Sequence, residues 1–534
     1  MKQGVEEEFS REERSALEPF FTNIDAPVFA LRNLPEVVKA ALFARYSRSP
    51  KSLRRLFLDE FLDGMEGGGG AAARIGIERS EKLFQRVLSE HGDDSVAQLG
   101  GAHIAVEGAS NILTKVLEWG RLMAYLEQST RYIPYTDRRG GAWRYVVPSE
   151  LDGSRLRDRY VGCLDRAFET YGRWIDAATR YFESQVAREE GVSAFVYKAT
   201  IRAKALDTLR GLLPAATRSN VGIFASGQAY ELLLLRMRTH ALAEVRDCAA
   251  TMLVELRKVI PAFLTRVDRP DRGEVWSGYL FSTREATENI AQQLLRGEEA
   301  ARRDEVTLAD YDPDGEVKVV AAALYAVSSL PDDQILARVR SMSVEERLSV
   351  LHAYVGERAN RRHKPGRAFE RTSYRFDILA DYGAFRDLQR HRMLTLEWQR
   401  FTPDFGYVTP PAVTEVGAVG EWGVVMADCA ELHAELAAAG LSAIAAYALP
   451  MAYRVRFYMD LSAREAMHVV ELRTTPQGHP AYRSVCQQMH RLIDQKAGHH
   501  AIAAAMRHVD HSAADQGRLD AERATEKKQL KAQS

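Results

Sequence analysis

The sequence carries one pattern twice, in the same order, and this repetition restricts the possible fold more than any other feature. Residues 36–47 read EVVKAALFARYS and residues 318–329 read KVVAAALYAVSS, with apolar residues at matching positions. Three further pairs follow: 121–132 with 392–403, 212–216 with 448–452, and 231–236 with 468–473. The separation between partners shrinks along the chain, which places longer loops in the first copy. Four pairs in register predict a duplicated domain.

The repeat predicts how the 534 residues are divided. A charged stretch that ends in turn residues separates the copies, and both ends of the chain are polar. We therefore expect a polar N-terminal segment at 1–25, a first domain at 26–269, a linker at 270–305, a second domain at 306–511 and a polar tail at 512–534.

Composition excludes several classes of protein. The net charge is -1, with 46% apolar and 27% charged residues, so no overall field attracts nucleic acid or a membrane. No apolar run reaches the length of a membrane span, and the acidic start is no signal peptide, so we expect a cytoplasmic protein. The four scattered cysteines form no C-x-x-C pair, and the C-terminal histidines lack a matching cysteine or carboxylate. We expect neither a disulfide framework nor a metal site.

Apolar residues at helical spacing predominate. They predict helices at 37–46, 81–92, 164–185, 228–259 and 484–495. Strand candidates are fewer, at 26–31, 102–108, 143–148, 373–379 and 406–411. Long helical runs with few strands predict an α+β fold. The glycine-rich stretch at 65–76 lacks the Lys-Ser/Thr of a phosphate loop and indicates a flexible connection.

Arg390, His391 and Arg392 stand side by side, ahead of a stretch that we expect to be helical. Successive helical residues point about 100° apart, so the three side chains either form a solvated turn or surround an anion. This RHR triplet, with VELR at 470–473 far downstream, resembles the flavin-dependent thymidylate synthase family. In that family the signature continues with a Ser, then Asn-Glu-Gln-Ser and Arg-Tyr.

The resemblance covers both copies and implies a fold and an activity. Members of the family are α+β homotetramers whose sites are assembled from several subunits, so we expect two tandem, helix-rich domains with an antiparallel sheet in each. Such enzymes hold FAD and dUMP together and transfer a methylene group from methylenetetrahydrofolate to the uracil, with reducing equivalents from NADPH. Because each chain holds two copies, a homodimer would reproduce the four subunits of the family's tetramer. The expected substrate is a pyrimidine nucleotide.

The second copy retains the residues that the resemblance assigns to flavin. These are Arg390, His391, Arg392, Glu370, Arg464 and His468. Arg473 stands at the position of the arginine that orients and polarises the pyrimidine. Glu397 replaces the signature Asn, and Thr402 and Pro403 stand where Arg and Tyr are expected. The nucleotide clamp is therefore missing from this copy.

The first copy retains the opposite end of the signature. The resemblance assigns nucleotide binding to Glu127, Gln128, Ser129, Arg131, Arg210 and Arg236, and Arg236 also stands at the polarising position. At the RHR position this copy reads Trp119, Gly120 and Arg121, and the counterparts of Arg464 and His468 are Gly227 and Glu231.

The residue types suit the implied chemistry. A guanidinium matches phosphate geometry with two hydrogen bonds, whereas an ammonium is only a point charge. An arginine at a uracil carbonyl favours the charge that develops there as C5 attacks, and one such donor lowers a barrier by roughly 3 kcal/mol. Because the flavin carries hydride, no cysteine nucleophile is needed.

The complementary losses lead to two hypotheses. In the first, the second copy holds FAD through its RHR triplet and the first copy holds the nucleotide, with Arg236 and Arg473 as catalytic arginines. The alternative is a non-catalytic flavin- or nucleotide-binding protein on the same fold.

Overall fold

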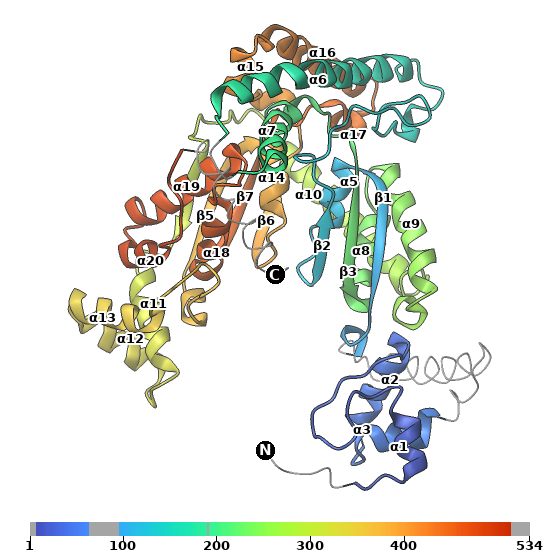
Figure 1. Cartoon of the computed structure of the whole chain (residues 1–534), viewed down its shortest axis with the longest axis vertical. Coiled ribbons are helices and arrows are strands. Elements are labelled where there is room, and N and C mark those ends of the chain that lie inside the picture. Colours follow the sequence, from blue (N-terminus) through green and yellow to red (C-terminus); the bar gives the residue numbers. More distant parts are fainter. Residues whose placement is uncertain (1–6, 48, 63–95, 189–191, 514–534) are drawn as a thin grey trace. The chain divides into compact units, whose positions relative to one another are not determined.

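A computed structural model describes the chain except residues 1–6, 48, 63–95, 189–191 and 514–534. The described residues form two compact units (Figure 1). Unit 1 consists of Met1–Glu107, Val116–Glu127 and Asn220–Glu298, and unit 2 of Gly108–Lys115, Gln128–Ser219 and Glu299–Ser534. The predicted boundaries at 269 and 306 divide the sequence by its repeat, whereas the compact units cut across the first copy.

Unit 1 begins with short helices and continues with a small sheet followed by helices. In chain order the elements are α1 Arg11–Leu17, α2 Glu36–Tyr46, α3 Leu53–Leu56, β1 Gly101–Ser110, α5 Asn111–Leu117, β2 Met123–Glu127, β3 Arg218–Ser226, α8 Gly227–Arg238, α9 Ala243–Arg257 and α10 Gly273–Leu294. The end of β1, the start of β3 and residues 111–115 of α5 belong to unit 2. The hydroxyl of Tyr230 on α8 donates to Ala102 of β1 at 3.0 Å, which fixes the helix against the sheet.

Unit 2 holds the long helices and the larger sheet. Its elements are α6 Arg157–Gln185, α7 Ala194–Leu209, β4 Val306–Tyr311, α11 Gly315–Tyr325, α12 Asp332–Ser341, α13 Val344–Val355, β5 Ser373–Asp381, α14 Tyr382–Gln389, β6 Leu394–Trp398, α15 Pro411–Glu415, α16 Val419–Ala438, α17 Ser442–Ala445, β7 Arg454–Ser462, α18 Ala463–Arg473, α19 Pro480–Gln495 and α20 His500–Ala505. Helices α14, α18 and α19 pack against its sheet.

The structure repeats one frame twice, as the sequence predicts. The order β1–α5–β2 and then β3–α8–α9 in the first copy matches β5–α14–β6 and then β7–α18–α19 in the second. The sheets have the orders β1-β3-β2 and β4-β5-β7-β6, so β3 and β7 each lie between the equivalent neighbours. Both sheets are antiparallel, which confirms the predicted α+β architecture with a sheet in each copy.

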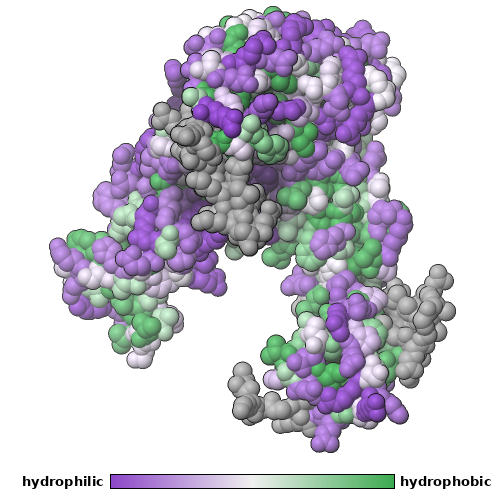
Figure 2. All heavy atoms as spheres, in the orientation of Figure 1, coloured by the Kyte–Doolittle hydropathy of each residue, from purple (hydrophilic) through white to green (hydrophobic). Residues whose placement is uncertain are grey.

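The outer faces of the two sheets differ in polarity. Strands β5 and β7 alternate buried apolar residues with polar ones, and Arg456 bridges to Asp377 across the strands at 3.1 Å. In unit 1 the outward residues Leu126 and Phe224 are exposed and apolar. Figure 2 shows hydrophobic surface over these strands. The outer face of the second sheet is therefore polar, whereas that of the first sheet carries exposed apolar side chains among polar ones.

The structure corrects several local expectations. The RHR triplet does not begin a helix, because α14 ends at Gln389 and strand β6 follows. The helix expected at 228–259 is two helices, α8 and α9, separated by a turn at 239–242. Of the expected strands, 102–108 and 373–379 are strands, whereas 26–31, 143–148 and 406–411 hold only isolated bridges.

Other expectations concern the connecting segments. Within the N-terminal segment, α1 is a helix with a capping box in which Ser10 and Glu13 bond each other's backbone. Residues 270–305, expected to be a linker, contain the 22-residue helix α10. The predicted helix at 81–92 and the glycine-rich stretch at 65–76 lie outside the described residues. No helix in the described part of the chain combines the length and apolarity needed to cross a bilayer.

Candidate functional site

Asp387 lies near the end of α14, buried among arginines from both copies. Arg390 follows it by one helical turn and forms a short ion pair with its Oδ1. Nη1 of Arg473 lies 3.7 Å from Oδ1, and Nη1 of Arg210 lies 3.6 Å from Oδ2. Although burial acts in the opposite direction, Arg390, Arg473, Arg210 and Arg131 hold the pKa of Asp387 far below its usual range. The carboxylate is therefore ionised under ordinary conditions.

Arg131 is fixed by residues of both copies. Its Nε and Nη2 donate to the two carboxylate oxygens of Asp207, each at 2.8 Å. Its remaining donors reach the hydroxyl of Tyr482 and the carbonyl of Gln477, both at 3.0 Å. The ion pair is buried, with 11% and 7% of the two side chains exposed. Paired geometry of this kind holds the guanidinium in one orientation.

Arg210 follows α7 and is nearly fully buried. Gly383, at the start of α14, makes room for it, because a Cβ at that position would lie 3.0 Å from Nη2. Among the described residues, Nη2 of Arg210 is buried and donates no hydrogen bond. A buried donor without an acceptor is costly, and the oxygen of an anionic ligand would satisfy it.

The charges of this cluster do not balance. Among the described residues, four guanidinium groups, those of Arg131, Arg210, Arg390 and Arg473, meet two carboxylates, Asp207 and Asp387. The cluster thus has an excess of two positive charges, which equals the charge of a phosphate monoester dianion. We name these six side chains the arginine cluster. It lies entirely within unit 2.

His391 connects the arginine cluster to a second group of cations. Nε of Arg473 donates to Nε2 of His391 at 2.8 Å, and Nη2 of Arg473 donates to the carbonyl of Asp387. Burial, assisted by Arg473, His468 and Arg390, lowers the pKa of His391 well below its usual value. The imidazole is therefore neutral.

The second group, which we name the outer cation group, consists of Arg361, Lys364, Arg392 and Arg464, and it lies beside His468. Arg464 donates to the carbonyl of Pro365 at 3.0 Å and pairs with Glu370 at 3.4 Å. Burial and the neighbouring Lys364 and Arg361 lower the pKa of His468 to about 4. This concentration of positive charge suits an anionic ligand such as a dinucleotide with two phosphates.

The corresponding position of the first copy is crowded by two side chains that would have to move to admit an imidazole. A Cβ on Gly120, the counterpart of His391, would lie 2.5 Å from the sulfur of Met123 and 2.7 Å from the hydroxyl of Tyr125. Arg236, the counterpart of Arg473, instead places its guanidinium over the ring of Trp119, 4.3 Å from the centroid. In unit 1 the polarising position is thus filled by a cation–π pair.

The other residues of the predicted clamp lie at the end of β2. Glu127 is buried as the last residue of the strand. The carbonyl of Gln128 accepts from the hydroxyl of Ser219 at 3.3 Å, and the hydroxyl of Ser129 accepts from the backbone N–H of Arg131 at 3.2 Å. These contacts shape the turn that carries Arg131.

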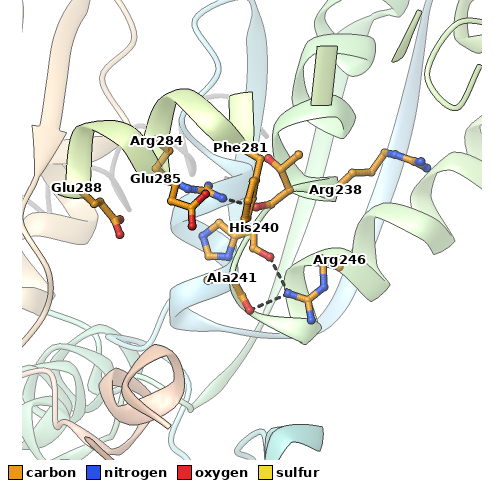
Figure 3. A pocket seen from close by; sticks show the side chains of 9 residues that line it. Arg238, His240, Ala241, Arg246, Phe281, Arg284, Glu285 and Glu288 are labelled. Atoms are coloured by element: carbon orange, nitrogen blue, oxygen red, sulfur yellow. Dashed lines mark hydrogen bonds between the residues drawn. The ribbon is translucent and has the colours of Figure 1, made fainter. Parts of the chain in front are cut away.

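Unit 1 has a hollow of about 500 Å³ at the turn that follows Arg236 (Figure 3). Arg246 donates to the carbonyls of His240 and Ala241 at 2.6 and 2.7 Å, and Arg284 of α10 donates to the carbonyl of Thr239. In unit 2 the carbonyl equivalent to that of His240 is that of Gln477, which accepts from Arg131. Arginines therefore cap the end of this helix in both copies, but they come from different elements.

The structure brings together some of the sequence-predicted residues and separates others. Arg131 and Arg210 of the first copy meet Arg390 and Arg473 of the second, whereas Arg236 belongs to unit 1. Sequence reasoning missed Asp207, Asp387, Glu465, Tyr482 and Lys364. Asp207 and Asp387 each precede a predicted arginine by three residues, and that spacing was the only available signal.

Both copies of the repeat match a known protein family, and relatives resemble the chain over all or part of its length. The family described as "Thymidylate synthase complementing protein" matches residues 37–262 and 307–498. A "UPF0159 protein" of Chlamydia muridarum is 38% identical over 97% of this chain and 98% of its own length. A "Flavin-dependent thymidylate synthase" of Clostridium tetani is 25% identical over 34% of this chain and 69% of that protein.

A solved structure is also similar over part of the chain. It is a UMP/dUMP methylase, PolB, from Streptomyces cacaoi bound with 5-Br dUMP. It is 20% identical and covers 38% of this chain and 96% of its own, with a TM-score of 0.31.

Proposed function

Because the chain belongs to the thymidylate synthase complementing protein family, we propose that it is a flavin-dependent enzyme that transfers a one-carbon unit to C5 of a pyrimidine nucleotide. In this proposal dUMP or a related nucleotide is the acceptor, methylenetetrahydrofolate is the donor, and NADPH supplies the reducing equivalents. The main support is the excess of two positive charges in the arginine cluster, which fits the phosphate of a nucleotide.

The arginine cluster would hold the nucleotide. Arg131 and Arg210 come from the first copy and would bind the phosphate, and the buried unsatisfied donor of Arg210 supports this role. Arg473, which is held by His391 and Asp387, would donate to a uracil carbonyl. A donor at that oxygen stabilises the negative charge that forms there as C5 attacks, by roughly 3 kcal/mol.

The outer cation group would hold FAD. Its side chains carry several positive charges beside the neutral rings of His391 and His468, and this donor set fits an anionic dinucleotide. FAD, when bound, supplies hydride chemistry to the reaction. The protein side chains would bind the phosphates of FAD. The flavin ring would lie close to Arg473, because His391, which lies beside the outer cation group, contacts Arg473 directly.

This division of labour differs in one respect from the assignment made on sequence. Arg236 lies over Trp119 in unit 1, so we assign the polarising role to Arg473. Arg236 would then belong to a second, incomplete site of the duplicated frame. We also propose that two chains associate into a homodimer with four repeated frames. Light scattering of the purified protein tests that assembly.

Two variants test the proposed sites separately. Arg464→Ala should release FAD, measured by absorbance of the protein after gel filtration, while dUMP still binds. Arg131→Ala should weaken dUMP binding, measured by calorimetry, while FAD is retained. If both variants lose flavin and neither loses nucleotide selectively, the division is wrong. Release of tritium from C5-labelled dUMP, with methylenetetrahydrofolate and NADPH, then measures the reaction itself.

One observation favours the non-catalytic alternative. The bidentate pair between Arg131 and Asp207 uses the edge of the guanidinium that a phosphate would need. A protein that binds FAD or nucleotide but releases no tritium under any tested condition would be a binding protein on this fold. A colourless protein that binds neither added FAD nor dUMP would rule out both functions.

A further inference from the structure

We propose that Glu465 is a positioning residue that fixes which nitrogen of His391 carries the proton, and through His391 the direction of Arg473. Glu465 lies in the first turn of α18, and it was not among the sequence-predicted residues. The inference rests on the proposed function for its consequence in catalysis. The proton arrangement itself can be tested without flavin or nucleotide.

The contact between Arg473 and His391 determines which nitrogen of His391 carries the proton. Nε of Arg473 donates to Nε2 of His391 at 2.8 Å. A guanidinium only donates hydrogen bonds, so Nε2 must present its lone pair. An imidazolium carries a proton on both nitrogens and could not accept this bond. The ring is therefore neutral, and its single proton lies on Nδ1.

The carboxylate of Glu465 is the nearest acceptor for the proton on Nδ1 of His391. Nδ1 of His391 lies 3.7 Å from Oε1 of Glu465, and only 4% and 12% of the two side chains are exposed. A shift of about half an ångström brings the pair to ordinary hydrogen-bond distance. The ring of His468 lies edge-on to His391, 5.5 Å away between centroids. A buried N–H needs an acceptor, and the carboxylate of Glu465 supplies it.

The same geometry argues against a metal ion at this position. His391, Glu465 and His468 have donor atoms within 4.8 Å of one another, which is close enough to share an ion. A metal at Nδ1 would need the lone pair of that nitrogen and would move the proton to Nε2. The proton would then face the N–H of Arg473, so the 2.8 Å hydrogen bond would be lost. The three side chains therefore suit a proton-bearing chain rather than a ligand set.

The charged surroundings make this acceptor sensitive to pH. Burial raises the pKa of Glu465 to about 7, against the opposing influence of Lys364, Arg464 and Arg392. His391 itself faces Arg473, His468, Arg390 and Asp387. Protonation of Glu465 would leave a neutral carbonyl oxygen opposite the Nδ1–H of His391, and this oxygen accepts a hydrogen bond more weakly than a carboxylate does. The chain from Glu465 through His391 to Arg473 should thus be best ordered above pH 7.

Two substitutions of Glu465 separate the role of the acceptor from the role of the charge. Glu465→Gln keeps an acceptor oxygen without titration, and Glu465→Leu removes the acceptor. We would label the histidines of the full chain with ¹⁵N and assign His391 with the variant His391→Gln. Nitrogen chemical shifts then report the tautomer directly. Glu415→Leu, which removes an exposed carboxylate elsewhere in unit 2, is the matched control.

The wild-type protein should show the Nδ1–H tautomer of His391 at pH 8, with a growing second population as the pH falls through 7. The Gln variant should show a tautomer population that is the same at both pH values, whereas the Leu variant should show a mixture at pH 8. In the Leu variant dUMP binding should weaken several-fold, and the Gln variant should largely restore it.

An Nε2–H tautomer or a charged His391 in the wild type at pH 8 would overturn the inference. So would an unchanged tautomer in the Leu variant. Absence of tritium release with the expected tautomers would count against the proposed function alone.

Discussion

The two copies keep one backbone frame but hold their equivalent arginines in different ways. Arg473, at the end of α18, contacts His391 and Asp387, whereas Arg236, at the same place in α8, lies over the ring of Trp119. The frame therefore tolerates either partner at this position. What differs is the chemistry available at this position. His391 and Asp387 fix the orientation of the guanidinium of Arg473, whereas the indole of Trp119 stacks on the guanidinium of Arg236.

The turn that follows each arginine shows the same contrast. In unit 2 the carbonyl of Gln477 accepts from Arg131, a residue of the other copy. In unit 1 the carbonyl of His240 accepts from Arg246, a residue of the next helix. The turn in unit 2 depends on a residue of the other copy, whereas the turn in unit 1 is held by arginines of α9 and α10 in the same unit. The comparison teaches that duplication freed one copy to supply parts to the other.

The largest expected effect concerns the pair that joins the copies. Arg131→Ala leaves Asp207 buried without its partner and should lower the free energy of unfolding by about 3–5 kcal/mol. The replacement of both residues, Arg131→Met with Asp207→Leu, should recover most of that loss. Urea unfolding measures both. Thr402→Ala, at the equivalent position of the second copy, should change stability by less than about 0.5 kcal/mol. Equal losses at the two positions would contradict the asymmetry.

The next effect concerns activity. Arg473→Lys removes the fork that bonds His391 and Asp387, so tritium release from labelled dUMP should fall about 100-fold, as for the loss of one preorganised donor. Arg236→Lys should cause a much smaller loss, since that arginine lies over Trp119. Comparable losses in the two variants would mean that both copies carry a working site.

A smaller effect concerns the crowded glycine. Gly120→Ala places a Cβ against Met123 and Tyr125 and should lower the free energy of unfolding by about 1–3 kcal/mol. Gly278→Ala is the matched control, because no atom lies within 4 Å of its Cβ position on α10. That change should be neutral or slightly stabilising. If Gly120→Ala is equally harmless, crowding does not explain why this copy lacks the histidine.

The smallest effect concerns acid. Burial lowers the pKa of His468 to about 4 and that of His479 to about 3 in unit 2, and that of His240 to about 4 in unit 1. A base with a lowered pKa in the folded state contributes stability above its unfolded pKa near 6.5, and that stability is lost as the pH falls toward 4. Glu465 opposes this trend, because its raised pKa favours the folded state on acidification from pH 7.

The pKa values of His391, His433, His499 and His511, also in unit 2, are lowered by burial as well. The balance should therefore weaken unit 2 before unit 1 between pH 7 and pH 5. Each histidine should contribute about 1 kcal/mol after allowance for partial exposure. Hydrogen exchange with mass spectrometry, at the two pH values, resolves the units by their peptides. Faster exchange in unit 1 than in unit 2 on acidification would contradict the prediction.

The repeated frame was accessible from sequence because its signal is local. Matched apolar positions and matched arginines are preserved in the same order in both copies, and they predicted the duplicated domain. The resemblance to a known family then predicted the sheet in each copy and the four arginines of the cluster. The RHR triplet was misplaced at the start of a helix because α14 is short and the strand β6 that follows reads like a helix. Tertiary pairing of β6 with β7 decided that segment.

The carboxylates of the cluster could not be predicted in the same way. Asp207 and Asp387 acquire their meaning from arginines 76 and 86 residues away, at positions 131 and 473. Acidic residues are common on helices, and spacing alone does not distinguish a solvated one from a buried one. The crowding at Gly120 is equally invisible, because it depends on side chains of the following strand.

The arginine cluster also limits how such a chain can be inherited. The residues that meet around Asp387 are encoded in distant halves of one reading frame. In a chimaera that takes each half from a different relative, the arginines of one half would not fit the carboxylates of the other. Recombination within the gene should be tolerated only where both sides of this contact come from one parent, and the halves should not persist as separately exchanged units.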